Sequence, residues 1–270
     1  MINNVLIIVG VYLFITAYIY SMQRDFIYFP DVVTPSLPDD AEKIMVKTRD
    51  GLNLYGWYLS AHSEVRAVIV LYHGNAGNLE DRLFKAREFT REGYSVLLVE
   101  YRGYGGNPGQ PDEAGLYMDG RAYLDFVQHD KGYALSDVII YGESLGSGIA
   151  TQMATEYEAK ALILEVPFDS LISMASQRYF FLPVRLLLKD RYMNIDKISH
   201  INMPLLILHG HKDEVIPFSL AKNLFDAAKT PKIFVDFPQG KHNDLYNFGA
   251  KERILDFLSG NTAQNTDNRD

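Results

Sequence analysis

At 270 residues, with 47% apolar and 22% charged residues, the chain has the composition of a globular protein and the length for one large α/β domain. Its formal net charge of −8 argues against nucleic acid as a partner, because phosphate binding requires a basic face. The chain has no cysteine, which excludes disulfides, thiolate metal sites and a cysteine nucleophile and leaves the redox compartment open.

The first segment, Ile2–Met22, contains no charged residue. As a helix it would rise about 31 Å, enough to cross the hydrocarbon core of a bilayer. Tyr18, Tyr20 and Tyr28 suit an interfacial aromatic belt. A cleavable signal peptide would require a basic n-region and small residues before the cut, which the sequence lacks, and a buried core helix is seldom so long without a charge. We therefore expect residues 1–23 to be a single-pass membrane anchor with the bilayer as a partner, while the side of the membrane on which the domain lies stays open.

From residue 43 onward, short apolar segments alternate with segments of helix length. An Asp50-Gly51 turn signal predicts an N-terminal hairpin, and the later strands are mostly continuous apolar runs, typical of parallel strands covered on both faces. This alternation predicts an α/β fold with a mostly parallel, doubly wound sheet in one domain over residues 24–260. Residues 261–270 are polar and aperiodic, which predicts a disordered tail. The expected strands are Lys43–Thr48, Asn53–Ser60, Ala67–Tyr72, Ser95–Glu100, Val138–Tyr141, Ala161–Val166, Leu205–Leu208 and Ile233–Phe237, and the expected helices are Leu79–Arg91, Asp112–Gln128, Ile149–Glu158, Ser219–Lys229 and Gly249–Leu258.

The strand at 138–141 runs directly into Gly142-Glu143-Ser144-Leu145-Gly146, and a segment of helical pattern follows. This is a G-x-S-x-G nucleophile elbow in the context that the motif requires, a strand, a sharp turn and a helix. A side chain at Gly142 or Gly146 would crowd the neighbouring backbone, and the turn forces Ser144 into a strained conformation with its hydroxyl exposed. A chance match is the alternative, because Gly/Ser pentapeptides are common. The context favours Ser144 as a catalytic nucleophile.

A base and an acid are expected late in the chain, because in this motif the order is Ser, acid, His. His242 follows the last expected strand in a glycine-containing loop, and Asp213 follows the strand Leu205–Leu208, where its carboxylate can orient His242. Asp169, after the strand Ala161–Val166, and Glu214 are rival acids, although Asp169 also suits a helix N-cap. His209-x-His211-x-Asp213 resembles part of a metallohydrolase ligand set, but no second ligand cluster accompanies it, so we predict no metal and no cofactor.

An oxyanion hole requires two backbone N–H groups beside the nucleophile. Leu145 supplies one at the start of a helix, and the loop His73-Gly74-Asn75-Ala76-Gly77-Asn78 is expected to supply the other, from Asn75 or alternatively Ala76. A glycine-rich phosphate cradle is the competing interpretation of this loop and of residues 103–109. Neither segment completes G-x-G-x-x-G or carries Gly-Lys-Ser/Thr.

About 35 residues without a clear strand separate Phe168 from Pro204. This insert, residues 169–203, is rich in aromatic and aliphatic side chains and is interpreted as a helical cap over the site, with Tyr179, Phe180 and Phe181 as substrate-binding candidates. Packing against the sheet or against the membrane is the alternative.

Five segments carry a family resemblance: H-G-N-A-G-N at 73–78, Y-R-G-Y-G at 101–105, G-E-S-L-G at 142–146, H-G-H-K-D-x-x-I-P at 209–217 and G-x-H-N-D at 240–244. Together they resemble the α/β-hydrolase superfamily over residues 24–260, and more narrowly its membrane-anchored branch of bud-emergence-suppressor-like proteins and α/β-hydrolase-domain lipases and depalmitoylases. The resemblance implies the α/β-hydrolase fold and a Ser144-Asp213-His242 triad. It does not imply a substrate. The cysteine-rich N-terminus of the palmitoylated depalmitoylases has no counterpart here.

These observations predict a membrane-anchored serine hydrolase that cleaves carboxylic esters or thioesters of acyl substrates. An aminopeptidase-like amide hydrolase is the alternative among enzymes. A catalytically idle, membrane-tethered binding scaffold is the alternative outside enzymes. Oligomeric state, acyl length and head group do not follow from the sequence.

Overall fold

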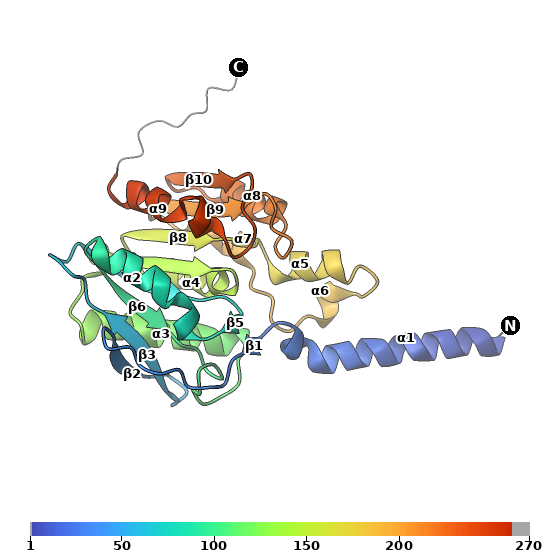
Figure 1. Cartoon of the computed structure of the whole chain (residues 1–270). Helices are drawn as coiled ribbons and strands as arrows, with labels where there is room; N and C mark the ends of the chain where they lie inside the picture. Colours follow the sequence, from blue (N-terminus) through green and yellow to red (C-terminus); the bar gives the residue numbers. More distant parts are fainter. Residues whose placement is uncertain (1, 261–270) are drawn as a thin grey trace, which may run out of the picture.

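Eight strands form one sheet in the order β10-β9-β8-β7-β4-β6-β3-β2 (Figure 1). The computed structural model describes residues 2–260 of the chain, so the expected tail at 261–270 lies outside the described residues. The strands are β2 (Glu42–Lys47), β3 (Asn53–Leu59), β4 (Ala67–Tyr72), β6 (Tyr94–Val99), β7 (Val138–Glu143), β8 (Ala161–Glu165), β9 (Leu205–Gly210) and β10 (Lys232–Phe237).

The sheet is parallel from β6 to β10 and antiparallel where β2 pairs with β3 and β3 pairs with β6. The β2–β3 pair is the hairpin predicted around Asp50-Gly51. Because parallel strands point the same way, the carboxyl ends of β4, β6, β7, β8, β9 and β10 meet at one edge of the sheet. The predicted fold class, a mostly parallel sheet with an N-terminal hairpin, is confirmed.

Helices cover both faces of this sheet, and each buries one apolar stripe. On one face lie α3 (Glu113–His129), α4 (Leu145–Glu156) and α8 (Phe218–Ala227), with Tyr123, Ile149 and Leu224 fully buried. On the other face lie α2 (Leu83–Arg91) and α9 (Ala250–Leu258), with Phe89 and Ile254 fully buried. Since both faces are covered, the central strands are apolar on both sides, as their continuous apolar runs predicted.

Two helices begin more than one residue away from the start that the sequence predicted. Helix α4 begins at Leu145, immediately after Ser144, and not at Ile149, because the strained turn at Ser144 leads straight into helical conformation. The segment Leu79–Arg91 is a 3₁₀ turn, η2 (Leu79–Arg82), followed by α2. Asn78 caps η2 with its side chain, which gives the loop before it a fixed end.

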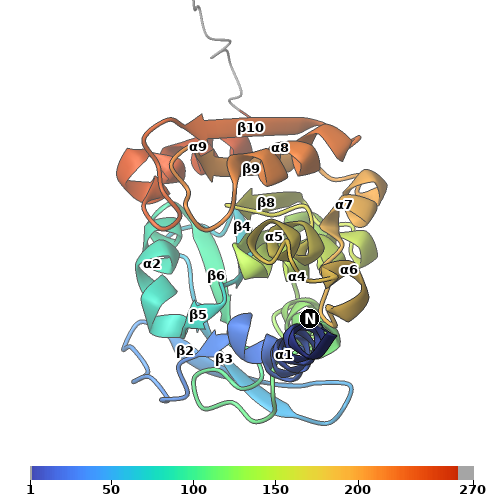
Figure 2. The same cartoon turned by 90° about the vertical axis from the view of Figure 1, so that its right-hand side faces the viewer.

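The insert between β8 and β9 contains α5 (Leu171–Arg178), α6 (Val184–Leu187), α7 (Asn194–Lys197) and the 3₁₀ turn η4 (Ile198–His200). Helices α5 and α6 lie beside α1 (Ile2–Met22), the N-terminal helix, which projects away from the sheet (Figures 1 and 2). The segment Ile2–Phe26 is long and apolar enough to cross a membrane, with a mean hydropathy of 2.2 over a window in which no residue is buried.

A short linker joins α1 to the sheet and touches the loop that follows β4. After the 3₁₀ turn η1 (Gln23–Phe26), strand β1 (Phe29–Pro30) pairs with β5 (Ala76–Gly77) in a two-stranded parallel ladder. This ladder was not predicted, because two residues are too few to show a strand pattern. It ties the N-terminal helix to the loop in which the oxyanion donor is expected.

Candidate active site

Ser144 lies at the sharp turn between β7 and α4. Its backbone has φ 51° and ψ −115°, a strained conformation for a residue with a side chain. Its N–H donates to the carbonyl oxygen of Glu165 in β8 at 2.9 Å, which holds the turn against the neighbouring strand. A Cβ at Gly142 would lie 2.6 Å from the Cβ of Ala150, and a Cβ at Gly146 would clash with the carbonyl of Tyr72. Glycine is therefore required at both motif positions, as the sequence indicated.

The structure brings the three predicted side chains together at the carboxyl edge of the sheet. His242, in the loop after β10, has Nε2 at 3.1 Å from Ser144 Oγ. Its Nδ1 lies 2.8 Å from Asp213 Oδ2, in the loop after β9. A carboxylate accepts, so Nδ1 carries the proton, and Nε2 is left free to accept the proton of Ser144. This is the arrangement that nucleophilic catalysis by a serine requires.

The carboxylate of Asp213 is held by more than His242. Its Oδ1 accepts hydrogen bonds from the backbone N–H groups of Val215 at 2.8 Å and Ile216 at 2.9 Å. Burial acts to raise the pKa of Asp213, but the hydrogen bond and the charge of His242, with these two backbone donors, outweigh it and leave that pKa below its ordinary value. Asp213 therefore stays ionised and fixed in orientation.

The two rival acids lie in other surroundings. Asp169 is buried, and its Oδ2 accepts from the side-chain amide of Asn223 at 3.1 Å, not from His242. The expectation that Asp169 caps the following helix is wrong, because Ser170 occupies the N-cap of α5 and accepts from the N–H of Ser173. Glu214 is exposed and lies on the wall of the cavity described below.

The other two histidines of this region have separate partners. His209 is buried with Nδ1 at 3.0 Å from the carbonyl of Gly210, and burial lowers its pKa. Its Nε2 lies 3.7 Å from Asp213 Oδ2, beyond hydrogen-bond distance. His211 instead pairs with Asp236 of β10 at 2.9 Å. Within residues 2–260 no group of three or more His, Asp or Glu side chains is arranged to hold a metal ion.

The expected oxyanion donors lie at the same place. Asn75 and Leu145 both line the cavity that contains Ser144. Among the described residues neither backbone N–H has an acceptor, so both are available to an oxyanion. The alternative donor, Ala76, belongs to β5 and pairs with Phe29. The position of Asn75 is fixed by its own carbonyl, which accepts from the N–H of Phe29 at 2.9 Å and from the hydroxyl of Tyr104 at 2.9 Å.

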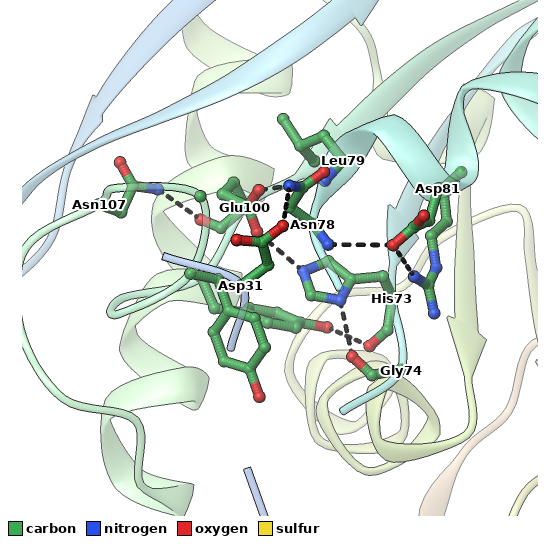
Figure 3. A network of polar contacts seen from close by, with 12 residues as sticks. Asp31, His73, Gly74, Asn78, Leu79, Asp81, Glu100 and Asn107 are labelled. Atoms are coloured by element: carbon green, nitrogen blue, oxygen red, sulfur yellow. Dashed lines mark hydrogen bonds and ion pairs between the residues drawn. The ribbon is translucent and has the colours of Figure 1, made fainter. Parts of the chain in front are cut away.

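A buried polar network holds the loop at residues 73–79, which contains Asn75 (Figure 3). His73 Nδ1 faces the carbonyl of Gly74 at 2.7 Å, and His73 Nε2 faces Glu100 Oε1 at 3.1 Å. The second oxygen of Glu100 accepts from the N–H of Leu79 at 3.1 Å. Both ends of the loop are therefore bound by one carboxylate, that of Glu100, which directly follows β6. His73 acts by positioning the loop, a role the sequence analysis did not assign to it.

A second buried network lies under the elbow. Lys85 of α2 donates to Glu143 and to Glu165, each at 2.6 Å, and Arg82 donates to Glu143 at 2.8 Å. Burial acts to lower the pKa of Lys85, but the two carboxylates outweigh it and raise that pKa above its ordinary value. Burial likewise acts to raise the pKa of Glu143, and the two cations outweigh it and hold that pKa well below its ordinary value. One feature of the sequence pointed to this network. Glu143, which occupies the variable position of G-x-S-x-G before Ser144, is charged although the strand that leads to it is apolar.

A cavity of about 640 Å³ contains Ser144 and extends between the insert and the N-terminal helix. Tyr179 is on its wall, whereas Phe180 and Phe181 are not among the lining residues and are 84% and 50% exposed. Most of the wall is apolar, and α1 contributes part of it. A cavity thus lies beneath the insert, as its interpretation as a cap requires. The apolar residues of the cavity wall include Ile19, Tyr20, Phe26, Ile27, Phe168, Leu171, Met174, Leu182, Val184, Leu187, Leu188 and Ile216.

The site and fold are those of an α/β hydrolase, and two comparisons agree. A family model described as serine aminopeptidase, S33, matches residues 63–194. The chain is 30% identical over 230 residues to the alpha/beta hydrolase domain-containing protein WAV2 of Arabidopsis thaliana, a match that covers 78% of this chain and 75% of that protein. The chain therefore belongs to the α/β-hydrolase family, and the predicted resemblance is confirmed.

Two further proteins are similar to this chain, one in sequence and one in fold. Protein bem46 of Schizosaccharomyces pombe is 30% identical over 263 residues, covering 90% of this chain and 88% of that protein. The esterase Pf2001 of Pyrococcus furiosus matches in structure with a TM-score of 0.70 at 16% identity, covering 87% of this chain and 97% of that one. At this identity the second match shows the fold alone.

Proposed function

We propose that the chain is a membrane-anchored serine hydrolase that cleaves ester or thioester bonds of substrates with an acyl chain. The observation that carries this proposal is the hydrogen-bonded series Ser144–His242–Asp213 at an apolar cavity. The charge-free helix Ile2–Met22, within the apolar segment Ile2–Phe26, supports the membrane anchor.

His242 Nε2 takes the hydroxyl proton of Ser144 as Oγ attacks the carbonyl carbon of the substrate. Asp213 accepts from Nδ1–H and stabilises the imidazolium that forms. When the tetrahedral intermediate collapses, the bond to the leaving alcohol or thiol breaks, and His242 returns the proton to that group. The acyl chain stays on Ser144 as an ester. Water, deprotonated by His242, then attacks this ester and releases the carboxylic acid.

The negative charge that develops on the carbonyl oxygen is stabilised by the N–H groups of Asn75 and Leu145. Leu145 is the first residue of α4, so the positive end of the helix dipole acts on the same oxygen. The β1–β5 ladder and the His73–Glu100 pair fix the Asn75 side of this hole before substrate arrives. A fixed donor stabilises the transition state without reorganisation.

The cavity supports the proposed substrate class. Its wall is mostly aliphatic and aromatic, and its 640 Å³ is in the range of pockets that hold drug-sized or acyl ligands. Burying each methylene of a chain there contributes about 0.8 kcal/mol. We therefore expect medium or long acyl chains to be preferred over acetyl groups.

An amide hydrolase is the second candidate, and two observations favour it. Glu214 is on the cavity wall, where a carboxylate is placed to bind a substrate amine, and the matching family model is described as a serine aminopeptidase. Comparing an aminoacyl anilide with the corresponding acyl ester, in the wild type and in Glu214→Gln, separates the two. A loss confined to the anilide in Glu214→Gln would support the amide alternative.

The test of the proposal is a fluorophosphonate probe combined with p-nitrophenyl esters from acetate to palmitate. We expect labelling of the wild type and none of Ser144→Ala. The turnover of Ser144→Ala should fall to the ~10³-fold over water that an oxyanion hole alone supplies. Unchanged turnover by Ser144→Ala would contradict the serine mechanism, and a chain that takes no probe would be the idle scaffold.

A further inference from the structure

We propose, on the basis of the anchored hydrolase proposed above, that the tip of the insert is a second membrane-inserted element, so that the acyl chain reaches Ser144 directly from the bilayer. The tip is defined here as residues 179–187, the turn and short helix between α5 and α7. The occupant of its exposed apolar surface is the lipid bilayer.

The first observation is the exposed apolar surface of the tip. Phe180, Phe181 and Leu186 are 84%, 50% and 82% exposed. They lie within seven consecutive residues, and the rings of Phe180 and Phe181 are in contact, with centroids 5.8 Å apart, so the exposed apolar side chains are concentrated at the tip. Large apolar side chains gathered in this way mark a surface that is covered in use.

The second observation is the contact between the tip and the proposed anchor. The hydroxyl of Tyr12, in the apolar stretch of α1, donates to the carbonyl of Phe181 at 3.0 Å. Tyr12 is ten residues before the end of α1 at Met22, about 15 Å along the helix. If α1 spans the bilayer, this contact lies within the hydrocarbon region, where both polar groups require a partner. Tyr12 and Phe181 satisfy each other there.

The third observation is the charge around the tip. Within residues 178–191, Arg178, Arg185, Lys189 and Arg191 flank the tip and Asp190 is the one acid, a charge of +3 for this segment in a chain of net charge −8. Asp190 is already paired with Arg24 at 3.0 Å, and Lys189 lies 4.3 Å above the ring of Tyr20. Long cationic side chains beside an apolar patch reach the phosphate layer while their stems stay among apolar groups. Because the tip also contacts the proposed membrane anchor at Tyr12, the bilayer is the anionic surface that these cationic side chains meet.

The fourth observation connects the tip to the reaction. The cavity that contains Ser144 is walled by Leu182 and Leu187 of the tip and by Ile19 and Tyr20 of α1. Gln23 fastens these two walls, because its side chain donates to the carbonyl of Leu187 at 3.3 Å and accepts from the N–H of Lys189 at 2.7 Å. The cavity thus lies between two elements that both enter the bilayer, and its entrance faces lipid.

The absence of cysteine allows a direct test on the full chain. Phe180→Cys and Leu186→Cys are labelled with an environment-sensitive thiol-reactive fluorophore and reconstituted into phosphatidylcholine–phosphatidylglycerol vesicles with or without doxyl-labelled lipid. Val65→Cys is the matched control, because Val65 is also exposed, at 49%, but precedes β4 and so lies at the opposite edge of the sheet. We expect blue-shifted emission and doxyl quenching at 180 and 186 and neither at 65. Quenching no stronger than at 65 would overturn the proposal, and a blue shift without quenching would assign the patch to a protein partner.

A second measurement concerns the route of the substrate. Leu186→Asp places a charge on the patch without touching the cavity wall, and Val65→Asp is its control. We expect Leu186→Asp to lower the ratio of activity on a vesicle-embedded long-chain ester to activity on a soluble acetate ester about tenfold, with no change in Val65→Asp. An unchanged ratio refutes delivery from the bilayer. If the chain hydrolyses neither ester, the proposed function fails, while the quenching result still decides where the tip lies.

Discussion

Among single residues, three carboxylates compete as the triad acid, and the structure gives them different neighbours. Asp213 contacts His242, whereas Asp169 contacts Asn223 and Glu214 is exposed. We expect Asp213→Asn to lower kcat on the order of 10⁴-fold, because an amide N–H facing Nδ1 would force His242 into the tautomer that cannot accept from Ser144. Steady-state kinetics with a p-nitrophenyl ester measure this change.

Asp169→Asn and Glu214→Gln are the matched controls for this prediction. Asp169→Asn weakens one hydrogen bond, so we expect a loss of about 1 kcal/mol in the free energy of unfolding and a nearly unchanged kcat. Glu214→Gln should leave ester turnover nearly unchanged. If Asp169→Asn abolished activity while Asp213→Asn were mild, the acid would have been assigned to the wrong strand.

The residues brought together at the site were predictable where a motif or a strand end marks them. Ser144, Asp213 and His242 each follow a strand whose apolar pattern is clear. The supporting residues were not predictable, because their roles depend on contacts between distant segments. His73 meets Glu100 across 27 residues, and Lys85 meets Glu165 across 80. Nothing in the local sequence of either pair indicates its partner.

At the scale of elements, the strands of the eight-stranded sheet were predicted to within two residues because their apolar runs are continuous. The insert was predicted to be helical, but the bounds of α5 to α7 were not predicted, because elements of four to eight residues show too few turns for a helical period. The participation of α1 in the cavity wall was also missed. A charge-free segment has no polar face that would indicate which side contacts protein.

Helix α2 and the elbow are joined by the buried charges of Lys85, Glu143 and Glu165. We expect Lys85→Met to lower the free energy of unfolding by about 3 kcal/mol, because it leaves carboxylates buried with fewer partners. Lys222→Met is the control, since Lys222 pairs with Asp226 on the exposed surface of α8 and should lose about 0.5 kcal/mol or less. Denaturant unfolding measures both. An equal effect of the two substitutions would contradict a structural role for the network.

The unfolding free energies of the wild type and of Lys85→Met should also depend differently on pH. The folded-state pKa of Glu143 is below its unfolded value, so its stabilising contribution is complete above the ordinary glutamate range and is lost as the pH falls through the folded value. Lys85→Met removes one of the two cations that lower this pKa. The difference in unfolding free energy between wild type and Lys85→Met should therefore be largest near neutral pH and become smaller in acid, which urea titrations at several pH values would measure.

At the scale of the whole molecule, the N-terminal helix has two tasks in the proposed enzyme, anchoring the chain and closing the cavity. We expect the full chain to remain in membranes through carbonate washing, and a chain that begins at Gln23 to be soluble. Beginning at Gln23 keeps the side chain that fastens Leu187 and Lys189, so the fold and the triad should be preserved. Activity on p-nitrophenyl acetate should be retained, while activity on long-chain esters should fall, because Ile19 and Tyr20 are lost from the cavity wall.

Two outcomes would contradict a spanning anchor. The first is extraction of the full chain from membranes by carbonate. The second is a protein purified from membranes whose N-terminus, measured by mass spectrometry, lies beyond Met22, because this would show a cleaved signal sequence in place of an anchor.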